Sequence, residues 1–186
     1  MNKQDPPNKR HRNFLLFAGA VRHATSVETL SSYLDIQVTE SQMDALRFLY
    51  INEHVSMGEI ATGLGYTISG ATKAVNRLED KGWVVRHPCL EDHREVHVSL
   101  TEQGREIAAK IMEATQERLD ELFSQISQTT LSRLDTAIEE FLRNIISDEK
   151  VTRQLCAVCG FQGGIHCSDT GVDCVVANAH RELHTE

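Results

Sequence analysis

Apolar residues recur at helical intervals over most of the chain. This spacing predicts helices over residues 13–34, 39–50, 56–64, 67–81, 101–127 and 130–146. Two short runs, 83–86 and 96–100, are rich in valine and predict strands instead. The polar stretch between these runs predicts that they form a hairpin with a long charged tip.

Short local patterns mark where two of these helices begin. Thr39–Gln42 and Ser56–Glu59 both have the spacing of a capping box, in which two side chains satisfy the free backbone groups at a helix start. Gly65 is a natural stop for the second helix, because glycine readily adopts the left-handed conformation that closes a helix. A short helix is therefore expected directly before the one that starts at Thr67.

The helix over 67–81 is the most informative. Its apolar residues predict one buried stripe, made of Ile68, Ala71, Val75 and Leu78. Its other side is polar and is formed by Ser69, Thr72, Lys73, Asn76 and Arg77. No acidic residue interrupts this set. Such a face is either a solvated helix surface or a surface that meets a polar ligand.

The helix over 101–127 is too long for the rest of this small chain to cover its apolar face. At 1.5 Å per residue it spans roughly 40 Å, so its apolar face needs a partner beyond its own domain. Residues 148–155 are expected to be a polar link, and a cysteine-rich tail follows. The predicted fold is mainly α: a basic disordered stretch over 1–12, a helical domain with one hairpin and long end helices (about 13–34 and 101–147) over 13–147, and a small cysteine-rich tail over 148–186.

The order of these elements favours DNA as the ligand. A helix, a short helix, an amphipathic helix and a charged hairpin follow one another as in a winged helix-turn-helix, and a major groove accommodates one α-helix. The five polar side chains of 67–81 can reach base edges and phosphates, while Arg86 and Arg94 can reach the backbone or the minor groove. The competing interpretation of the helix alone is an ordinary solvated face.

Composition narrows the class further. The chain has 186 residues and a net charge of −8, which excludes a uniformly basic protein that coats nucleic acid. It does not exclude a sequence-specific DNA-binding protein, because such a protein needs only a local basic surface. No apolar run approaches the roughly 18–20 residues of a membrane span. The basic and then apolar start resembles a short signal peptide, but its apolar pattern continues helically, which favours a cytoplasmic protein.

The sequence resembles the MarR family of bacterial transcriptional regulators over roughly residues 30–147. The resemblance rests on Thr39–Gln42, Glu59–Ala61, Ser69–Arg86, the wing residues Asp92, His93 and Arg94, and Val98–Gly104. It implies that Asp92 orients Arg94, which enters the minor groove. The family more often has arginine where His93 stands. The resemblance also implies a homodimer formed by the first and last helices on a pseudo-palindromic duplex, with repression as the commoner mode.

Four cysteines lie within 19 residues of the tail, as Cys156-x2-Cys159-x7-Cys167-x6-Cys174. In a cytoplasmic protein, clustered cysteines more often bind metal than form disulfides. Cys156 and Cys159 are expected to chelate one centre from a tight loop at Gly160. Because the other two cysteines form no second tight pair, an iron–sulfur cluster is favoured over zinc.

The leading hypothesis is a DNA-binding regulator, not an enzyme, whose affinity is set by the metal centre. A centre that orders the tail against the dimerisation helices would change the spacing of the two recognition helices. One alternative is a ligand-responsive regulator with a purely structural zinc site. A redox enzyme is a further alternative, but no nucleotide-binding glycine motif accompanies the cysteines.

Overall fold

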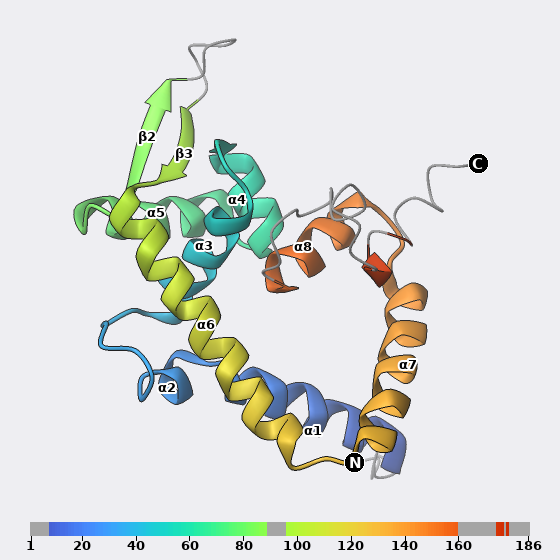
Figure 1. Ribbon diagram of the computed structural model, residues 1–186. Coiled ribbons are helices and arrows are strands. Elements are labelled where there is room, and N and C mark those ends of the chain that lie inside the picture. The colour runs from blue at the N-terminus through green and yellow to red at the C-terminus, as the bar shows by residue number, and fades with distance from the viewer. Residues whose placement is uncertain (1–7, 89–95, 160–173, 177, 179–186) are drawn as a thin grey trace, which may run out of the picture.

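The computed structural model of the protein describes residues 8–88, 96–159, 174–176 and 178. Figure 1 shows the arrangement of its elements. The helices in the described part are α1 (Lys9–Ala24), α2 (Val27–Leu30), α3 (Glu40–Ile51), α4 (Met57–Leu64), α5 (Ile68–Asp80), α6 (Glu102–Ser124), α7 (Gln128–Ile145) and α8 (Glu149–Cys159). The strands are β1 (Val55–Ser56), β2 (Val84–Pro88) and β3 (Val96–Leu100).

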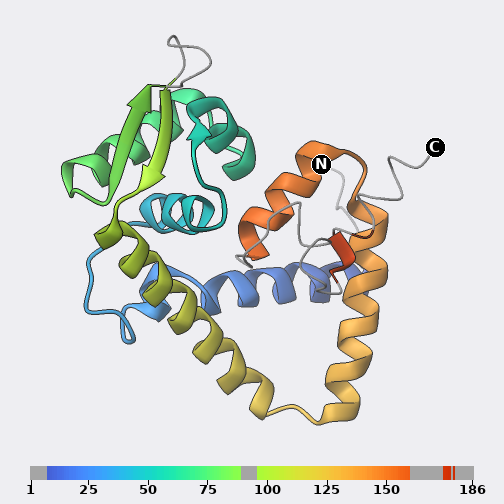
Figure 2. The ribbon, with the colours of Figure 1, turned by 45° about the horizontal axis from the view of Figure 1, so that its top comes forward.

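The elements divide into a compact winged-helix part and an open frame. α3, α4, α5 and the strands form the winged-helix part, and the long helices α1, α6 and α7 form the frame (Figure 2). α6 leads away from the winged-helix part, and α7 returns on the other side of the frame. The predicted strand pair and the predicted order of helices from 39 to 146 are confirmed.

One hydrophobic core holds the winged-helix part to the beginning of the frame. Its fully buried large side chains are Leu30, Met43, Leu46, Leu49, Ile60, Val75, Leu78, Val98 and Ile111. Complete burial of one such side chain stabilises the fold by about 1.5–3 kcal/mol. Since Leu30 lies on α2 and Ile111 on α6, the core extends beyond α3, α4 and α5.

The sheet is antiparallel, in the order β1-β3-β2. Val84 pairs with Leu100 and His87 with His97, so the two long strands form the predicted hairpin. β1 pairs with β3 through Val55 and Val98 and was not predicted, because two residues are too short for a strand pattern.

The junction between the sheet and α6 is tight. Thr101 donates its backbone N–H to the carbonyl oxygen of Trp83 at 3.0 Å, and its hydroxyl donates to the carbonyl oxygen of Gly82 at 2.8 Å. Gly104 lies so close to Trp83 that a Cβ there would overlap the Trp83 carbonyl oxygen. Only glycine allows this approach of the two backbones.

Both predicted capping boxes are present. Thr39 and Ser56 each accept the backbone N–H three residues later, and the side chains of Gln42 and Glu59 accept the N–H of the capping residue in return. Gly65 ends α4 in the left-handed conformation, with φ of 67°. The sequence therefore located the starts of α3 and α4 correctly.

The prediction of one helix over 13–34 was wrong. α1 begins at Lys9, so residues 9–12 are not a disordered stretch, and it ends at Ala24. Ser26 then starts the separate helix α2 by accepting the N–H of Thr29 on its hydroxyl at 3.4 Å. Serine competes for backbone hydrogen bonds in this way, which interrupts a helix that apolar spacing alone would continue.

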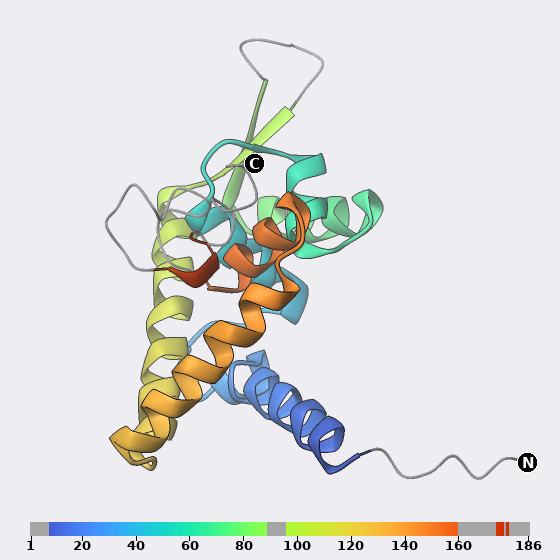
Figure 3. The same ribbon diagram turned by 90° about the vertical axis from the view of Figure 1, so that its right-hand side faces the viewer.

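The prediction of a polar link over 148–155 was also wrong, because this segment starts α8. Asp148 accepts the backbone N–H of Val151 at 2.9 Å, and this hydrogen bond lowers the pKa of its carboxyl group. Thr152 is fully buried, and Cys156 is also buried. α8 packs against α4 and α3, beside the winged-helix part (Figure 3).

The frame exposes many apolar side chains. α7 has no buried residue although its apolar residues follow a helical spacing, and Leu15 and Leu16 of α1 are 72% and 64% exposed. Phe14 and Phe141 bring α1 and α7 together, with ring centroids 4.5 Å apart. None of the helices in the described residues is long and apolar enough to span a membrane.

Candidate nucleic-acid interface

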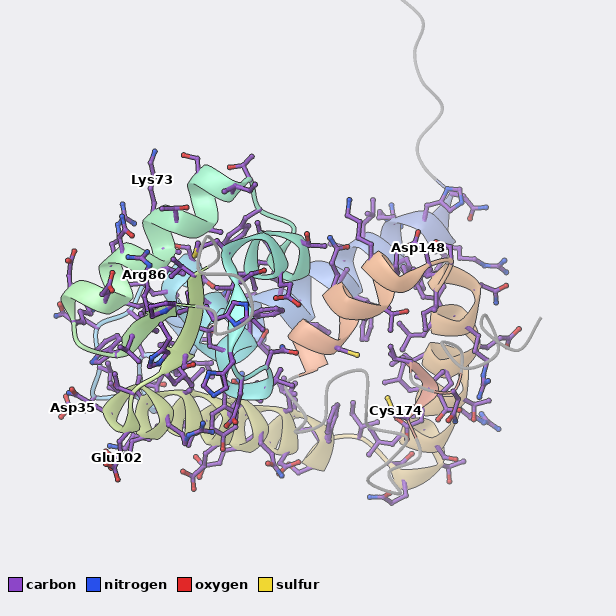
Figure 4. The ribbon with its side chains drawn as sticks, turned by 90° about the horizontal axis from the view of Figure 1, so that it is seen from above. Asp35, Lys73, Arg86, Glu102, Asp148 and Cys174 are labelled. Atoms are coloured by element: carbon purple, nitrogen blue, oxygen red, sulfur yellow. The ribbon has the colours of Figure 1, made fainter. Side chains whose placement is uncertain are left out.

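α5 presents the predicted polar face to solvent. Thr67 caps the helix by accepting the N–H of Gly70 at 3.1 Å. Ser69, Lys73, Asn76 and Arg77 are exposed and Thr72 is half-buried. Figure 4 shows Lys73 pointing away from the body of the protein. The structure therefore brings together the five α5 residues predicted to meet DNA.

One member of the predicted buried stripe lies elsewhere. Ile68 is 64% exposed, whereas Ala71, Val75 and Leu78 are buried as expected. Ala74 is buried in addition. The apolar period was therefore right along most of α5, but Ile68 is its first residue, and the neighbouring elements do not cover that end.

Arg86 of β2 is tied to α5. Its guanidinium forms an ion pair with Glu79 and donates a hydrogen bond to Oδ1 of Asn76 at 2.6 Å. Two residues predicted to contact DNA thus contact each other. Sequence reasoning missed Glu79, although its position three residues after Asn76 places both on one side of the helix.

The root of the wing is described, but its tip is not. Arg86 lies opposite Val98 in the strand register, and His54 shares a hydrogen bond of 2.9 Å with the Ser99 hydroxyl. The predicted wing residues Asp92 and Arg94 lie outside the described residues, and so does Cys89.

A shallow hollow of about 460 Å³ lies at the start of α5. Its lining residues are Ser41, Gly65, Tyr66, Thr67, Gly70, Lys73, Ala74 and Arg77. Two of them are cationic and none is acidic, and the N-terminus of a helix carries a partial positive charge. This edge of α5 is therefore suited to the phosphate backbone of a duplex.

Tyr66 holds the segment that leads into α5 against α3. Its hydroxyl donates to Oδ2 of Asp44 on α3 at 2.6 Å. Burial raises the pKa of the Tyr66 hydroxyl, and the hydrogen bond to Asp44 raises it further. The tyrosine is therefore neutral near pH 7, and it fixes the segment between α4 and α5 against α3.

The structure brings two of the four predicted metal ligands into one cluster. Cys156 of α8 is buried with Ile146 and Val176, and Cys174 packs against the same group. Figure 4 labels Cys174, which lies near α7. Cys159 is the last residue of α8, and Cys167 lies outside the described residues.

Cys156 and Cys159 lie on a helix, whereas Gly160, where the chelate loop is expected, lies outside the described residues. Cys156 and Cys159 both belong to α8, because the Asp148 cap and the buried Thr152 favour a helix there. Within the described residues, no three histidine, cysteine, aspartate or glutamate side chains are arranged as a metal site. Cys167 lies outside the described residues, so the four-cysteine set stays a prediction.

Comparison with known proteins identifies relatives of this arrangement. The sequence model of the MarR family matches residues 35–95. The chain is 28% identical over 94 residues to the transcriptional repressor MprA of Escherichia coli K12, covering 50% of this chain and 53% of MprA. It is 28% identical over 124 residues to the HTH-type transcriptional repressor IacR of Pseudomonas putida, covering 67% of this chain and 73% of IacR. The match thus spans about half the length of MprA.

Solved structures share the fold over a longer stretch. The reduced form of MarR from E. coli is 25% identical and has a TM-score of 0.60, covering 76% of this chain and 99% of MarR. MepR, a transcription regulator of the Staphylococcus aureus multidrug efflux pump MepA, has a TM-score of 0.62 at 17% identity and covers 74% and 99%. The protein therefore has the winged helix-turn-helix fold of MarR-type regulators.

Proposed function

We propose that the protein is a MarR-family transcriptional regulator that binds double-stranded DNA and acts as a repressor. The observation that carries the proposal is the polar, cation-bearing outer face of α5 beside a hairpin wing. The matched relatives MprA and IacR are named repressors, and a MepR variant of the same fold has been solved bound to an oligodeoxyribonucleotide. The proposal includes a cytoplasmic location and no catalytic activity.

The proposal also includes a homodimer on a pseudo-palindromic operator. Its support is the frame, since α7 buries no residue and α1 exposes Leu15 and Leu16. Apolar surface of this extent marks a protein interface. A second copy covering the frame would relate the two α5 helices by a two-fold axis, and they would meet half-sites about one helical turn, roughly 34 Å, apart.

The test is selection of duplexes from a random pool by the full-length protein, followed by affinity measurements at moderate salt. A pseudo-palindromic sequence bound more tightly than random DNA, with two copies of the chain per duplex, is the expected result. Equal affinity for random DNA would contradict the proposal, and so would a monomer at micromolar concentration.

We further propose that Cys156, Cys159, Cys167 and Cys174 hold a metal centre, an iron–sulfur cluster in preference to zinc. The support is that Cys156 and Cys174, which are far apart in the sequence, pack in one small cluster with Ile146 and Val176. Thiolate ligands in an apolar shell suit such a centre. A cluster would supply sensitivity to oxygen or to redox potential.

α8 offers a route from this centre to DNA. Its Gln154 side chain donates to the carbonyl oxygen of Thr62 at 3.3 Å and lies near Gly65, which ends α4. Two residues later, Thr67 caps α5. The sequence led us to expect a route through the dimerisation helices, whereas α8 packs directly on the helix that precedes α5. The proposed centre would therefore act on DNA affinity by holding or releasing α8.

Iron, zinc and acid-labile sulfide analysis of protein purified without oxygen tests the centre. Iron and sulfide in similar amounts are expected in the wild type, and their loss is expected in a variant with all four cysteines replaced by serine. One zinc and no sulfide would favour the structural alternative. Folded protein that binds neither iron nor zinc would contradict both the iron–sulfur and the zinc proposal.

A second candidate is a regulator that responds to a small molecule. It is favoured by a hollow of about 330 Å³ beside α6. The hollow is lined by Tyr33, Leu34, Asp35, Ile36, Lys110, Glu113, Ala114 and Glu117. In this case the cysteines would bind a structural zinc, and oxygen would leave the affinity for DNA unchanged.

A further inference from the structure

Ile68 occupies an unusual place on the candidate interface. It is the first residue of α5 and 64% exposed, while the other aliphatic side chains of this helix are buried. A single exposed isoleucine is ordinary on a protein surface and carries little meaning alone. The side chains beside it on α5 indicate what it could contact.

Thr72, one helical turn further along α5, adds a second apolar group. Its hydroxyl donates to the carbonyl oxygen of Ile68 at 2.7 Å, so the hydrogen it could offer to a base is already used. What remains for a ligand is chiefly its methyl group. Because residues four apart are neighbours on a helix surface, Ile68 and Thr72 form an apolar edge beside the polar Ser69.

The chemistry of the major groove identifies what this edge fits. The N-terminal residues of a recognition helix meet base edges, and the apolar group on those edges is the 5-methyl group of thymine. Resting on the proposed DNA binding, we infer that Ile68, with the methyl group of Thr72, contacts a thymine methyl group in each half-site. Ile68 is then a specificity-determining residue, and the operator carries a required thymine at that position.

Lys73 and Arg77 give this contact its position. They line the hollow at the start of α5 together with Thr67, so phosphates held there fix the first turn of the helix in the groove. Phosphate contacts set the register of a helix on the duplex but carry no sequence information. The preference for one base must come from side chains such as Ile68 and Asn76.

The test uses full-length protein and the duplex selected from a random pool. Each thymine of a half-site is replaced in turn by deoxyuridine, which lacks the 5-methyl group and keeps the same base pairing. At one thymine position, this replacement is expected to lower the affinity of the wild type about fourfold per half-site. That is the change in affinity expected when one methyl-sized apolar group is no longer buried. Ile68→Ala is expected to bind the thymine duplex more weakly and to be insensitive to that replacement.

Val85→Ala is the matched control, because it shortens an exposed valine of β2 outside α5. It is expected to keep the full thymine effect. If Ile68→Ala kept that effect as well, or if no replacement weakened the wild type, this inference would be overturned while DNA binding stood. If the selection enriched no duplex, the proposed function would fail first and this inference with it.

Discussion

The guanidinium of Arg86 on β2 donates a hydrogen bond of 2.6 Å to Oδ1 of Asn76 on α5, and the same guanidinium pairs with Glu79. The wing root and α5 are therefore joined through two side chains predicted to meet DNA. Because Oδ1 accepts from Arg86, the Asn76 amide group is oriented with its N–H donors away from the wing. This orientation precedes any contact with a base.

Asn76→Ala is expected to relax the preference for one base pair per half-site. A bidentate base contact needs Oδ1, so Asn76 must exchange Arg86 for the base when DNA binds. The loss should then be about 1–3 kcal/mol at that position, the range for such a contact. Affinities for a set of single-base operator variants measure it. Asn144→Ala, which changes an exposed asparagine of α7, is the control and should leave the preference unchanged. An unchanged preference in Asn76→Ala would mean that Asn76 reads no base.

Lys73→Ala is expected to weaken binding to all duplexes about equally. Loss of one phosphate contact should make the slope of log affinity against log salt shallower by about 0.9. Arg94→Ala should act in the same direction if the wing residue enters the minor groove. Lys110→Ala removes an exposed lysine of α6 and should leave the slope as it is. Identical slopes for Lys73→Ala and the wild type would contradict the assignment of α5.

Replacing both Leu15 and Leu16 by glutamate is expected to produce a monomer. Burying these two carboxylates in an apolar interface between copies would cost more than the interface gains, since an unpaired charge is strongly disfavoured there. Sedimentation equilibrium at micromolar concentration measures the change. Val96→Glu, a similar change on β3, should remain a dimer. A double variant that stayed dimeric would remove α1 from the interface.

Thr152→Arg is expected to displace α8 from α4, because a fully buried threonine leaves no room for arginine. The main hydrophobic core includes no residue of α8, so the variant should still fold and dimerise. If α8 couples the tail to DNA, operator affinity should change by about 1–3 kcal/mol. Ser147→Arg adds the same side chain at an exposed position and should have no effect. Unchanged affinity in Thr152→Arg with α8 displaced would exclude this route.

Acid is expected to loosen α8. The hydrogen bond from Val151 lowers the pKa of the Asp148 carboxyl group in the folded protein, so its contribution is present above the unfolded pKa and is lost as pH falls through the folded one. Hydrogen exchange of the α8 amides should therefore speed up below about pH 4, the usual range of aspartate. Asp148→Asn keeps an acceptor at the cap and should remove this acid dependence. Equal acid dependence in Asp148→Asn would assign it to another group.

Local patterns predicted the parts of the fold that local chemistry determines. The capping boxes at Thr39 and Ser56 and the polar face of α5 depend on residues a few positions apart. The two valine-rich strands follow each other along the chain, which predicted their hairpin but not its register. These features located the winged-helix part and the α5 residues of the candidate interface.

The features that the sequence did not predict depend on contacts between distant segments. α8 looked like a polar link because its cover comes from distant segments. The helix packs on α4 and α3, and its Cys156 lies against Ile146 and Val176. Nothing near Thr152 in the sequence indicates that cover. The ion pair between Glu79 and Arg86 joins a helix to a strand. Ile68 followed the apolar period of α5, but it is the first residue of that helix and its side chain stays exposed.

The close approach of Gly104 to Trp83 bears on how the molecule can move. With no side chain between the two backbones, and with Thr101 bonded to both Gly82 and Trp83, no hinge separates α6 from the end of the α5–β2 segment. α6 and α5 must then turn as one body. A 23-residue helix is roughly 35 Å long, so a tilt of about 5° at its far end displaces the other end by about 3 Å. A small change in how two copies pack at the end of α6 is enough to move α5 out of register with a neighbouring groove.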